Sequence, residues 1–467
     1  MSVREASLMM GGVLPAEREE NYYKSLSISS VSIDSRKISK GAMFFALKGE
    51  KTDGHDYVEN AVSGGAVCCV VEKENDQTVK LRKNSSCSFI VVENTLQALQ
   101  LLSKKYREQF KEIFIIGITG SSGKTTTKEL LASILSKEGL TVWNEGNLNS
   151  ETGLPLSIFR IRKEHRFGVF ELGMNHQGEM DILVDILMPD FAVLTNIGTA
   201  HIGLLGSRDK IAEEKMKIFH KSGNLKAGII YENDDYAAEI LKKFPSCVTA
   251  YGVESQKEEI RAEYKGLSGT LIQLGGESVN FPLIGRHNLL NCLAAVKTAK
   301  YLGVSDEKIK LALEEAKPLA GRGEIINGNV TVISDCYNSN RESVKAALDF
   351  FDSIPWEGRK AVLLGSILEL GSDSERIHSD VIDFAFDSSA DAVFFFGNEI
   401  EKSFITAGEK SSSGKYVFCT GDPGKMADAL SGYLECGDII LLKGSRGMAL
   451  ERFLEPIGKI NRKVPNC

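Results

Sequence analysis

A glycine-rich segment, GITGSSGKTT at residues 117–126, constrains the fold of this chain more than any other feature. It follows an apolar run at 113–116 that predicts a buried strand, and it precedes residues 128–137, where leucine and isoleucine recur at helical spacing. A strand, a glycine loop and a helix in this order can bind phosphates through backbone N–H groups and the helix N-terminus. The segment therefore predicts binding of ATP or GTP, with a plain glycine-serine turn before a helix as the alternative.

The residue types in this loop match the chemistry of a nucleotide site. Lys124 would neutralise the outer phosphates, and the hydroxyl of Thr125 would hold Mg²⁺. The glycines stand at 117, 120 and 123, a G-x-x-G-x-x-G-K-T spacing, whereas the general motif requires glycine at position 118, which is Ile118 here. The loop therefore follows a more specific glycine pattern than the general phosphate-loop motif.

Length and composition exclude several classes of protein. With 467 residues the chain is expected to form about two to four domains. A net charge of −7 without a long basic run argues against nucleic acid as the main partner. No apolar run approaches the ~20 residues that span a membrane, and residues 1–20 do not resemble a secretory signal. Nine cysteines without a C-x-x-C pair predict buried free thiols in a reducing cytoplasm.

The first of three regions, residues 1–110, contains apolar runs at 44–47, 66–71 and 89–92 that predict strands alternating with helices. It carries Asp34, Ser35 and Arg36 in succession. Such a tripeptide can form a turn with a local salt bridge, or its arginine can grip a diphosphate beside hydroxyl and backbone donors. The sequence leaves both interpretations open.

The second region, residues 111–318, alternates strands and helices in the manner of an α/β sheet of largely parallel strands. A predicted strand at 167–171 ends in Glu171, and another at 191–197 is followed by His201. Ligands bind outside the carboxyl ends of such strands, so both residues are expected on the same rim as the glycine-rich loop. This position favours Mg²⁺ binding or catalysis over a helix cap and a structural histidine.

Two helices of the second region carry further candidates. Lys215 lies in a predicted helix at 208–221 whose lysines and glutamates are typical of a solvated, ion-paired face. Asn288 and Asn291 lie one turn apart at the start of a long helix that reaches residue 302. Their amides could read the edge of an adenine, or Asn288 could only cap the helix.

The third region, residues 319–467, begins at a glycine-rich link at 320–323. Apolar runs in it predict strands with helices between them, at 330–333, 360–365, 392–396 and 438–442. They indicate a second open α/β domain of Rossmann type. A G-x-G-x-x-G segment is missing from this region, so a bound dinucleotide is not predicted.

The loop spacing, the three-region order, Glu171, His201 and the sequence His287-Asn288 with Asn291 resemble those of the Mur ligases, ATP-dependent enzymes that build the peptide stem of bacterial cell-wall precursors. The resemblance covers nearly the whole chain. It implies three α/β domains: a small UDP-binding domain, a central phosphate-loop ATPase domain with a mainly parallel sheet, and a C-terminal Rossmann-like domain that binds the acceptor. Folylpolyglutamate synthetases share the ATPase core but lack a first domain with Asp-Ser-Arg, and they are less similar.

Three segments of the third region are similar to those of the Mur ligase that adds D-alanyl-D-alanine: DCYNSN at 335–340, LGSILELG at 364–371 and LLKGSRGM at 441–448. The resemblance implies that the chain joins this dipeptide to UDP-N-acetylmuramoyl-tripeptide through an acyl phosphate, for peptidoglycan synthesis in the cytoplasm, as a monomer. The chain departs from the family pattern at Ser366, Ile367 and Arg341, and slightly at 149–153. These departures concern recognition of the dipeptide more than the ATP chemistry.

The resemblance also implies roles for individual residues. The catalytic residues would be Lys124, Glu171, His201 and Lys215. One Mg²⁺ would be held by Thr125 and Glu171, and a second by His201. Lys215 matches the lysine that Mur ligases carry as a carbamate, an anionic oxygen ligand suited to this metal. ATP would be bound by Thr119, Gly120, Ser121, Ser122, Gly123, Lys124, Thr125, Thr126, Asn288, Asn291, Arg322 and Asp335. The other substrates would be bound by Asp34, Ser35, Arg36, Asn149, Asn338 and Asn340.

Three other functions stay open at this point. The chain could be a ligase of the same superfamily that adds a single amino acid, or a degenerate protein that only binds ATP or a UDP-sugar. A kinase or motor ATPase is the third alternative, but it leaves the first region and the GSRGM segment without a role. The third residue of the tripeptide, diaminopimelate or lysine, is not determined. Since ATP and acceptor must meet, we expect a hinge near 318–323.

Overall fold

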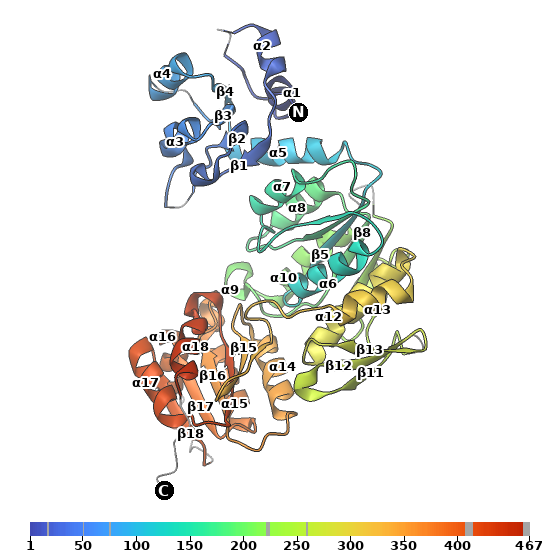
Figure 1. Ribbon diagram of the computed structural model, residues 1–467, viewed down its shortest axis with the longest axis vertical. Coiled ribbons are helices and arrows are strands. Elements are labelled where there is room, and N and C mark those ends of the chain that lie inside the picture. The colour runs from blue at the N-terminus through green and yellow to red at the C-terminus, as the bar shows by residue number, and fades with distance from the viewer. Residues whose placement is uncertain are drawn as a thin grey trace.

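The computed structural model of the protein describes residues 1–15, 18–49, 51–73, 76–220, 225–257, 260–406 and 414–460. The chain forms three successive α/β bodies along its long axis, with the N-terminal body at one end and the C-terminal body at the other (Figure 1). This architecture confirms the predicted α/β fold of three domains. Residues 461–467, which the sequence analysis assigns to the third region, lie outside the described residues.

The first body has a four-stranded parallel sheet in the order β1-β2-β3-β4. Its strands are β1 (Ser30–Ser32), β2 (Ala42–Phe45), β3 (Cys68–Val71) and β4 (Ser88–Val91). Its helices are α1 (Val3–Met9), α2 (Glu20–Ser25), α3 (Val58–Ser63), α4 (Asp76–Asn84) and α5 (Thr95–Arg107). β2 and β3 are buried at every position because apolar clusters cover both faces of the sheet, and such strands read as continuous apolar runs.

The second body has a six-stranded parallel sheet in the order β10-β9-β8-β5-β7-β6. Its strands are β5 (Phe114–Thr119), β6 (Thr141–Trp143), β7 (Phe167–Glu171), β8 (Phe191–Leu194), β9 (Ala227–Tyr231) and β10 (Val248–Tyr251). The helices between them are α6 (Lys124–Ser136), α7 (Gly153–Ile158), α8 (Glu179–Leu187), α9 (Ile202–Leu205), α10 (Arg208–Met216) and α11 (Ala237–Lys243). β5 pairs with both β7 and β8, so the segments that follow these three strands meet at one rim.

The second body continues in a three-stranded antiparallel sheet that the sequence analysis does not predict. It consists of β11 (Ile260–Tyr264), β12 (Thr270–Leu274) and β13 (Glu277–Phe281), followed by α12 (Arg286–Tyr301) and α13 (Asp306–Glu314). β12 alternates buried and partly exposed side chains, and four of the five residues of β11 are exposed. Only one face of this sheet packs on the protein, so its strands lack the apolar runs that mark the parallel strands.

The third body has a six-stranded sheet in the order β14-β15-β19-β16-β17-β18, parallel except for β14. Its strands are β14 (Glu324–Ile326), β15 (Thr331–Asp335), β16 (Lys360–Gly365), β17 (Ala392–Phe396), β18 (Tyr416–Thr420) and β19 (Ile439–Lys443). Its helices are α14 (Arg341–Asp352), α15 (Ser374–Asp387), α16 (Asn398–Thr406), α17 (Pro423–Tyr433) and α18 (Leu454–Gly458). The predicted strands at 360–365 and 392–396 coincide with β16 and β17, whereas the partly exposed edge strands β14 and β18 are not predicted.

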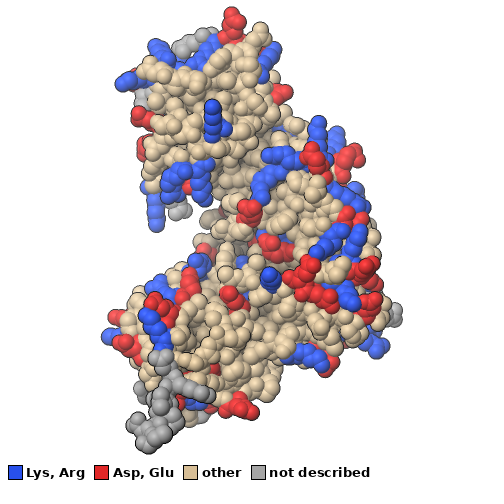
Figure 2. Space-filling model, in the orientation of Figure 1, with Lys and Arg blue, Asp and Glu red and all other residues tan. Residues whose placement is uncertain are grey.

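The surface mixes acidic and basic side chains over the visible face (Figure 2). A notch separates the first body from the third on one side, and Lys and Arg side chains gather on the first body where it borders this notch (Figure 2). Within the described part of the chain, no helix has both the length and the apolar character required to cross a bilayer. The basic border of the notch suits an anionic ligand.

Candidate active site

A cavity of about 710 Å³ opens where the carboxyl ends of the central strands face the third body. We refer to this cavity as the cleft. The site residues predicted from the sequence that line it are Ser121, Ser122, Gly123, Lys124, Thr125, Thr126, Asn149, Glu171, His201, Asn288, Asn291, Arg322, Asp335, Asn338 and Asn340. The fold therefore brings most of the predicted residues of the second and third bodies to one place.

The glycine-rich loop can turn between β5 and α6 because two of its residues have no side chain at positions where neighbouring atoms come very close. Gly123 has a φ of 81°, and a Cβ at this residue would lie 2.2 Å from Oδ1 of Asn291. A Cβ on Gly120 would lie 1.8 Å from Oγ1 of Thr195. These approaches fix the backbone at the N-terminus of α6, where N–H groups without helical partners attract phosphate.

Two residues after β8 hold the glycine-rich loop in place. The side chain of Asn196 accepts a hydrogen bond from the N–H of Ser122 at 3.0 Å and donates one to the carbonyl of Ser122 at 3.0 Å. The hydroxyl of Thr195 donates to the same carbonyl at 2.6 Å. No pattern in the sequence predicted a role for these two residues. Their signal in the sequence is a pair of small polar side chains directly after a buried strand.

Two lysines share one acceptor beneath the loop. Nζ of Lys124 donates to the carbonyl of Gly120 at 2.7 Å, and Nζ of Lys215 donates to the same carbonyl at 3.1 Å. Lys215 is 1% exposed, which excludes the solvated helix face that its charged neighbours suggest. The fold therefore places two amines of like charge side by side, one of them fully enclosed.

Burial shifts the ionisation of both lysines. Burial and the charge of Lys124 hold the pKa of Lys215 well below its usual range, against the opposing charges of Glu214 and Glu171. Burial likewise lowers the pKa of Lys124, whose charged form Glu171 favours and Arg322 disfavours. An enclosed amine of lowered pKa is a group that can act as a nucleophile or be modified.

Hydroxyl and carboxylate oxygens line the cleft beside Lys124. The hydroxyl of Thr125, in the first turn of α6, donates to Oε2 of Glu171 at 2.7 Å. The other carboxylate oxygen, Oε1, accepts a hydrogen bond from Nδ2 of Asn149 at 2.7 Å. Asn149, which we expected at the substrate, therefore contacts Glu171. Oxygen donors of this kind are the ligands that Mg²⁺ prefers.

Asn144, a residue that the sequence analysis misses, holds Glu171 from behind. Its side chain accepts a hydrogen bond from the N–H of Glu171 at 2.9 Å and donates one to the carbonyl of Glu171 at 3.0 Å. The carbonyl of Asn144 in turn accepts a hydrogen bond from Nζ of the buried Lys128 at 2.6 Å. Since Asn144 is fully buried, these bonds fix the carboxyl end of β7.

His201 precedes α9 and has a φ of 64°, a left-handed conformation that is uncommon outside glycine. Its Nδ1 lies 2.7 Å from Oε2 of Glu369, which comes from the third body. Burial lowers the pKa of His201, and the charges of Lys124 and Lys215 act in the same direction, whereas Glu369 opposes them. These effects favour the neutral imidazole, which is the form that binds metals.

Asn288 and Asn291 are buried at the start of α12. Nδ2 of Asn288 donates to the carbonyl of Ile284 at 2.8 Å, and Nδ2 of Asn291 donates to Oδ1 of Asn288 at 3.3 Å. The hydroxyl of Thr127 donates to Oδ1 of Asn291 at 3.3 Å and so joins α12 to α6. Asn288 does not cap the helix, because Gly285 occupies the N-cap position.

Arg322 and Asp335 extend the cleft into the third body. Nη2 of Arg322 donates to the hydroxyl of Thr125 at 3.0 Å, and the guanidinium lies over the ring of Tyr337 at 4.1 Å. A carboxylate oxygen of Asp335 lies 2.9 Å from Nζ of Lys443. The link that precedes β14 therefore contacts the glycine-rich loop directly.

The start of α14 connects the two bodies at a second place. Asn340 caps this helix, and its Nδ2 donates to the hydroxyl of Ser122 at 2.9 Å. Glu342 accepts hydrogen bonds from the N–H and the hydroxyl of Thr199 at 3.1 and 2.9 Å. Asn338 is exposed at the wall of the cleft. The third body therefore docks on the loop and on the segment after β8.

Four groups of predicted residues do not line the cleft, namely Asp34 to Arg36, Thr119, Gly120 and Lys215. Asp34 accepts a hydrogen bond from the N–H of Arg36 and pairs with its guanidinium at 2.9 Å, which lowers the pKa of Asp34 to about 2. This geometry is that of a local salt-bridged turn, although the side chain of Arg36 remains 86% exposed. The hydroxyl of Thr119 donates to the carbonyl of Leu172 at 2.9 Å and so joins β5 to β7.

Two departures from the family pattern lie inside the third body and not at the cleft. Ser366 is 1% exposed, and its hydroxyl accepts a hydrogen bond from the N–H of Ile400 at 3.1 Å, near the start of α16. The guanidinium of Arg341 pairs with Asp380 on α15 at 2.6 Å. Both side chains make contacts within the third body, so neither departure argues for a degenerate site.

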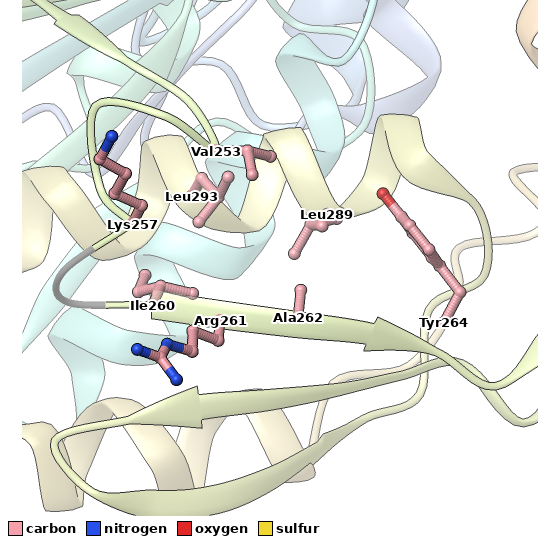
Figure 3. Close-up of a pocket in the computed structure, with 8 residues that line it drawn as sticks. All are labelled: Val253, Lys257, Ile260, Arg261, Ala262, Tyr264, Leu289 and Leu293. Carbon is pink, nitrogen blue, oxygen red and sulfur yellow. The ribbon is translucent and has the colours of Figure 1, made fainter.

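A second cavity of about 560 Å³ lies between α12 and β11 (Figure 3). Its lining residues are Val253, Lys257, Ile260, Arg261, Ala262, Tyr264, Leu289 and Leu293. The leucines of α12 face apolar side chains of β11 across it, and basic side chains lie at one end (Figure 3). This cavity contains none of the predicted site residues.

Three family profiles match the chain: "Mur ligase family, catalytic domain" at residues 27–107, "Mur ligase middle domain" at 118–299 and "Mur ligase, glutamate ligase domain" at 321–446. The chain belongs to the Mur ligase family. Among its relatives, the UDP-N-acetylmuramoyl-tripeptide--D-alanyl-D-alanine ligase of Treponema pallidum is 38% identical over 91% of this chain and 93% of that protein. The ligase of the same name from Bacillus subtilis is 32% identical over 93% and 94%.

Solved structures agree with this family. A crystal structure of MurF from Acinetobacter baumannii superposes with a TM-score of 0.86 at 31% identity, over 98% of both chains. The MurF ligase from Thermotoga maritima in complex with ADP superposes with a TM-score of 0.78 at 28% identity, over 93% of this chain and 98% of that one. The predicted family is therefore confirmed.

Proposed function

We propose that the protein is an ATP-dependent ligase that joins D-alanyl-D-alanine to UDP-N-acetylmuramoyl-tripeptide and so forms the UDP-linked pentapeptide for peptidoglycan synthesis. The relatives at 38% and 32% identity carry the name of this activity, and the Thermotoga maritima structure contains ADP. One observation carries the proposal: a single cleft in which the glycine-rich loop meets Arg322 and Asn340 of the third body. Such a cleft can hold a nucleotide and an acceptor together.

Joining a carboxylate to an amine in water requires activation of the carboxylate. In the proposed reaction the terminal phosphoryl group of ATP passes to an oxygen of the tripeptide carboxylate, and ADP leaves. The amine of D-alanyl-D-alanine then attacks the acyl carbon, the C–N bond forms, the amine loses a proton, and inorganic phosphate leaves with the electrons of the C–O bond. For phosphoryl transfer, positioning and charge neutralisation are the main contributions of a protein.

The residues at the cleft suit this task. Lys124 and the N–H groups at the start of α6 would hold the β- and γ-phosphates. Arg322, whose guanidinium already contacts Thr125, would add a second positive charge from the third body, and Asp335 of that body lines the same cleft. Asn288 and Asn291 line the cleft behind the loop and would contact the adenine by their amides.

The oxygen donors beside the loop fit Mg²⁺. The hydroxyl of Thr125 and the carboxylate of Glu171 lie 2.7 Å apart at the wall of the cleft, and Glu171 is only 3% exposed. A largely buried carboxylate beside a hydroxyl offers hard oxygen ligands to a small divalent cation. We assign Thr125 and Glu171 to hold one Mg²⁺ and His201 to hold a second, and these ions would neutralise phosphate charge when bound.

We also propose that Lys215 is carbamylated. Its ammonium form would share the carbonyl of Gly120 with Lys124, and two enclosed like charges repel each other. Attack of the neutral amine on CO₂ forms an N–C bond, and loss of one proton from the nitrogen leaves an anionic carbamate. The carbamate would pair with Lys124 and offer an oxygen ligand to Mg²⁺. The lowered pKa of Lys215 supports this reaction, which requires the neutral amine.

We propose that the three bodies are the domains 1–110, 111–318 and 319–467. Each domain would bind a different part of the substrates. The exposed guanidinium of Arg36, with Asp34 and Ser35, would contact the diphosphate of the UDP group, and the basic border of the notch suits it (Figure 2). We assign the remaining substrate contacts to Asn149, Asn338 and Asn340. Because the reaction uses ATP, we place it in the cytoplasm, and because one chain supplies every residue named here, we expect a monomer.

The proposed function is tested by ADP release from ATP and Mg²⁺ with UDP-N-acetylmuramoyl-tripeptide, with and without D-alanyl-D-alanine, followed by the mass of the product. We expect ADP and a UDP-linked pentapeptide only when the dipeptide is present. Turnover with a single amino acid in place of the dipeptide would assign another ligase activity. Binding of ATP and UDP-sugar without any turnover would favour the degenerate protein. Parallel assays with lysine and diaminopimelate tripeptides identify the third residue.

Replacement of Arg322 by alanine is expected to lower kcat about 100-fold, because one cationic donor at a site of developing phosphate charge typically contributes this much. The side chain donates one hydrogen bond to Thr125 and lies over the ring of Tyr337, so we expect little change in Tm. Steady-state ADP release and a thermal melt measure both quantities. Lys317→Ala, an exposed position five residues earlier, is the control. A wild-type kcat in Arg322→Ala would remove Arg322 from the site.

A further inference from the structure

Glu369 belongs to the third body, in the loop between β16 and α15, but its side chain reaches the second body. Its Oε2 lies 2.7 Å from Nδ1 of His201. Its carbonyl accepts a hydrogen bond from the N–H of Gly203 at 3.0 Å. The side chain and the backbone of one residue therefore both contact the start of α9, and the reaction described above leaves Glu369 without a role.

Backbone packing holds this contact in one geometry. Glu369 and His201 both have a φ of 64°, in the left-handed region that residues with a Cβ rarely adopt. A Cβ on Gly203 would lie 2.4 Å from the backbone nitrogen of Gly371 and 2.6 Å from the carbonyl oxygen of Glu369. The two loops therefore touch backbone to backbone. Strained residues of this kind persist where the surrounding structure over-determines them, and they cluster at functional sites.

The loop that carries Glu369 is tied to the third body. The N–H of Ile367 donates to Nε2 of His378 on α15 at 3.0 Å. The N–H of Leu368 donates to the hydroxyl of Ser445, two residues after β19, at 3.0 Å. Both anchors belong to the third body. Glu369 therefore moves with that body and reaches His201 only when the third body is docked on the second.

We propose that Glu369 is a positioning residue that holds His201 in the tautomer with hydrogen on Nδ1 and presents Nε2 to the cleft. This inference rests on the proposed role of His201 in holding Mg²⁺. A carboxylate accepts hydrogen bonds, so the ring nitrogen that faces it carries the hydrogen and the other nitrogen keeps its lone pair. Partners of this kind fix the ring orientation of metal-binding histidines. Since the partner comes from the third body, docking completes the site at which the acyl phosphate forms.

Kinetics of two variants test the proposal. Glu369→Ala is expected to lower kcat about 10- to 100-fold, the usual effect of losing such a partner, with unchanged KM values for ATP and D-alanyl-D-alanine. Glu369→Gln keeps an acceptor oxygen at the same reach, so it is expected to lose less activity than the alanine variant. Glu375→Ala, at an exposed position in the first turn of α15, is the matched control and is expected to keep the wild-type kcat.

¹⁵N NMR of histidine-labelled protein reports the tautomer without any assay of activity. The chain has seven histidines, and the signals of His201 are identified by their loss in His201→Gln. We expect hydrogen on Nδ1 in the wild type and in Glu369→Gln, and loss of this preference in Glu369→Ala. A wild-type kcat or an unchanged tautomer in Glu369→Ala overturns the proposal, because a residue that only docks the third body would leave the ring unaffected.

Failure of the proposed function and failure of the alanine variant to fold can both be distinguished from failure of this proposal. If the wild-type enzyme has no ligase activity, the proposed function fails, whereas the NMR measurement still decides whether Glu369 sets the tautomer. If Glu369→Ala does not fold, Glu369→Asp replaces it, since its side chain is one methylene shorter and cannot reach Nδ1 from the same backbone position. The same loss of kcat and of the Nδ1 hydrogen is then expected, and a wild-type result for both overturns the proposal.

Discussion

Replacing Lys124 by alanine is expected to lower kcat about 10³-fold and to raise the KM for ATP. The amine of Lys124 lies at the wall of the cleft and donates to the carbonyl of Gly120 in its own loop, so it is in a position to bind a phosphate. Its interaction strengthens as negative charge develops during phosphoryl transfer, which is the condition for an effect on kcat as well as on binding. Steady-state ADP release with saturating UDP-linked tripeptide and dipeptide measures the change.

Lys137→Ala is the matched control for this variant. Lys137 is the C-cap of the same helix, α6, and its exposed ion pair with Glu315 contributes less than about 1 kcal/mol to stability. It is therefore expected to keep the wild-type kcat. The Tm of Lys124→Ala should also stay near the wild-type value, because only one hydrogen bond within the loop is lost. A kcat of Lys124→Ala within tenfold of the wild type would contradict its assignment to the phosphates.

Replacing Lys215 by alanine is expected to lower kcat about 10²- to 10³-fold, because it removes the proposed anionic ligand behind the loop. The Tm is also expected to fall, because the variant leaves a cavity at a 1% exposed position and removes the proposed pairing of the carbamate with Lys124. The kcat is therefore measured at a temperature at which the variant is fully folded. A kcat near the wild-type value under this condition would remove Lys215 from the site.

¹³C NMR with labelled bicarbonate tests the carbamate on Lys215 directly. We expect one carbamate signal in the wild type and none in Lys215→Ala. Lys210→Ala, an exposed position on the same helix, α10, should keep both the signal and the activity. Removal of CO₂ from the buffer is expected to lower the wild-type rate, and added bicarbonate should restore it. An equal spectrum in the wild type and Lys215→Ala would show that the lysine is unmodified.

Sequence patterns predicted the parts of the fold in which neighbouring residues along the chain decide the structure. The strands β7, β16 and β17 coincide with predicted runs, because parallel strands covered on both faces are apolar at every position. The strand-loop-helix around Lys124 was predicted for the same reason, since its glycines and its apolar flanks are contiguous. The antiparallel sheet from β11 to β13 was missed because its strands expose many of their side chains.

Lys215 illustrates where local patterns mislead. Its neighbours in α10 are mostly charged, and this composition predicts a solvated face. Lys215 lies, however, three and four residues after Ala212 and Ile211, which are both buried, so all three share one face of the helix. Packing of that face beneath the glycine-rich loop encloses the amine. The spacing was visible in the sequence, but the surface against which it packs was not.

The sequence by itself determined the family, the nucleotide loop and the rim on which Glu171 and His201 lie, because these depend on residue order along single strand-loop units. Only the tertiary structure decided which distant side chains meet. Asn144 and Asn196 hold the rim, and Glu369 reaches His201 from another body, through contacts that no local periodicity encodes. The physical reason is that hydrogen bonds between distant segments depend on how strands pair and how the bodies dock, whereas strands and loops form from the chemistry of adjacent residues.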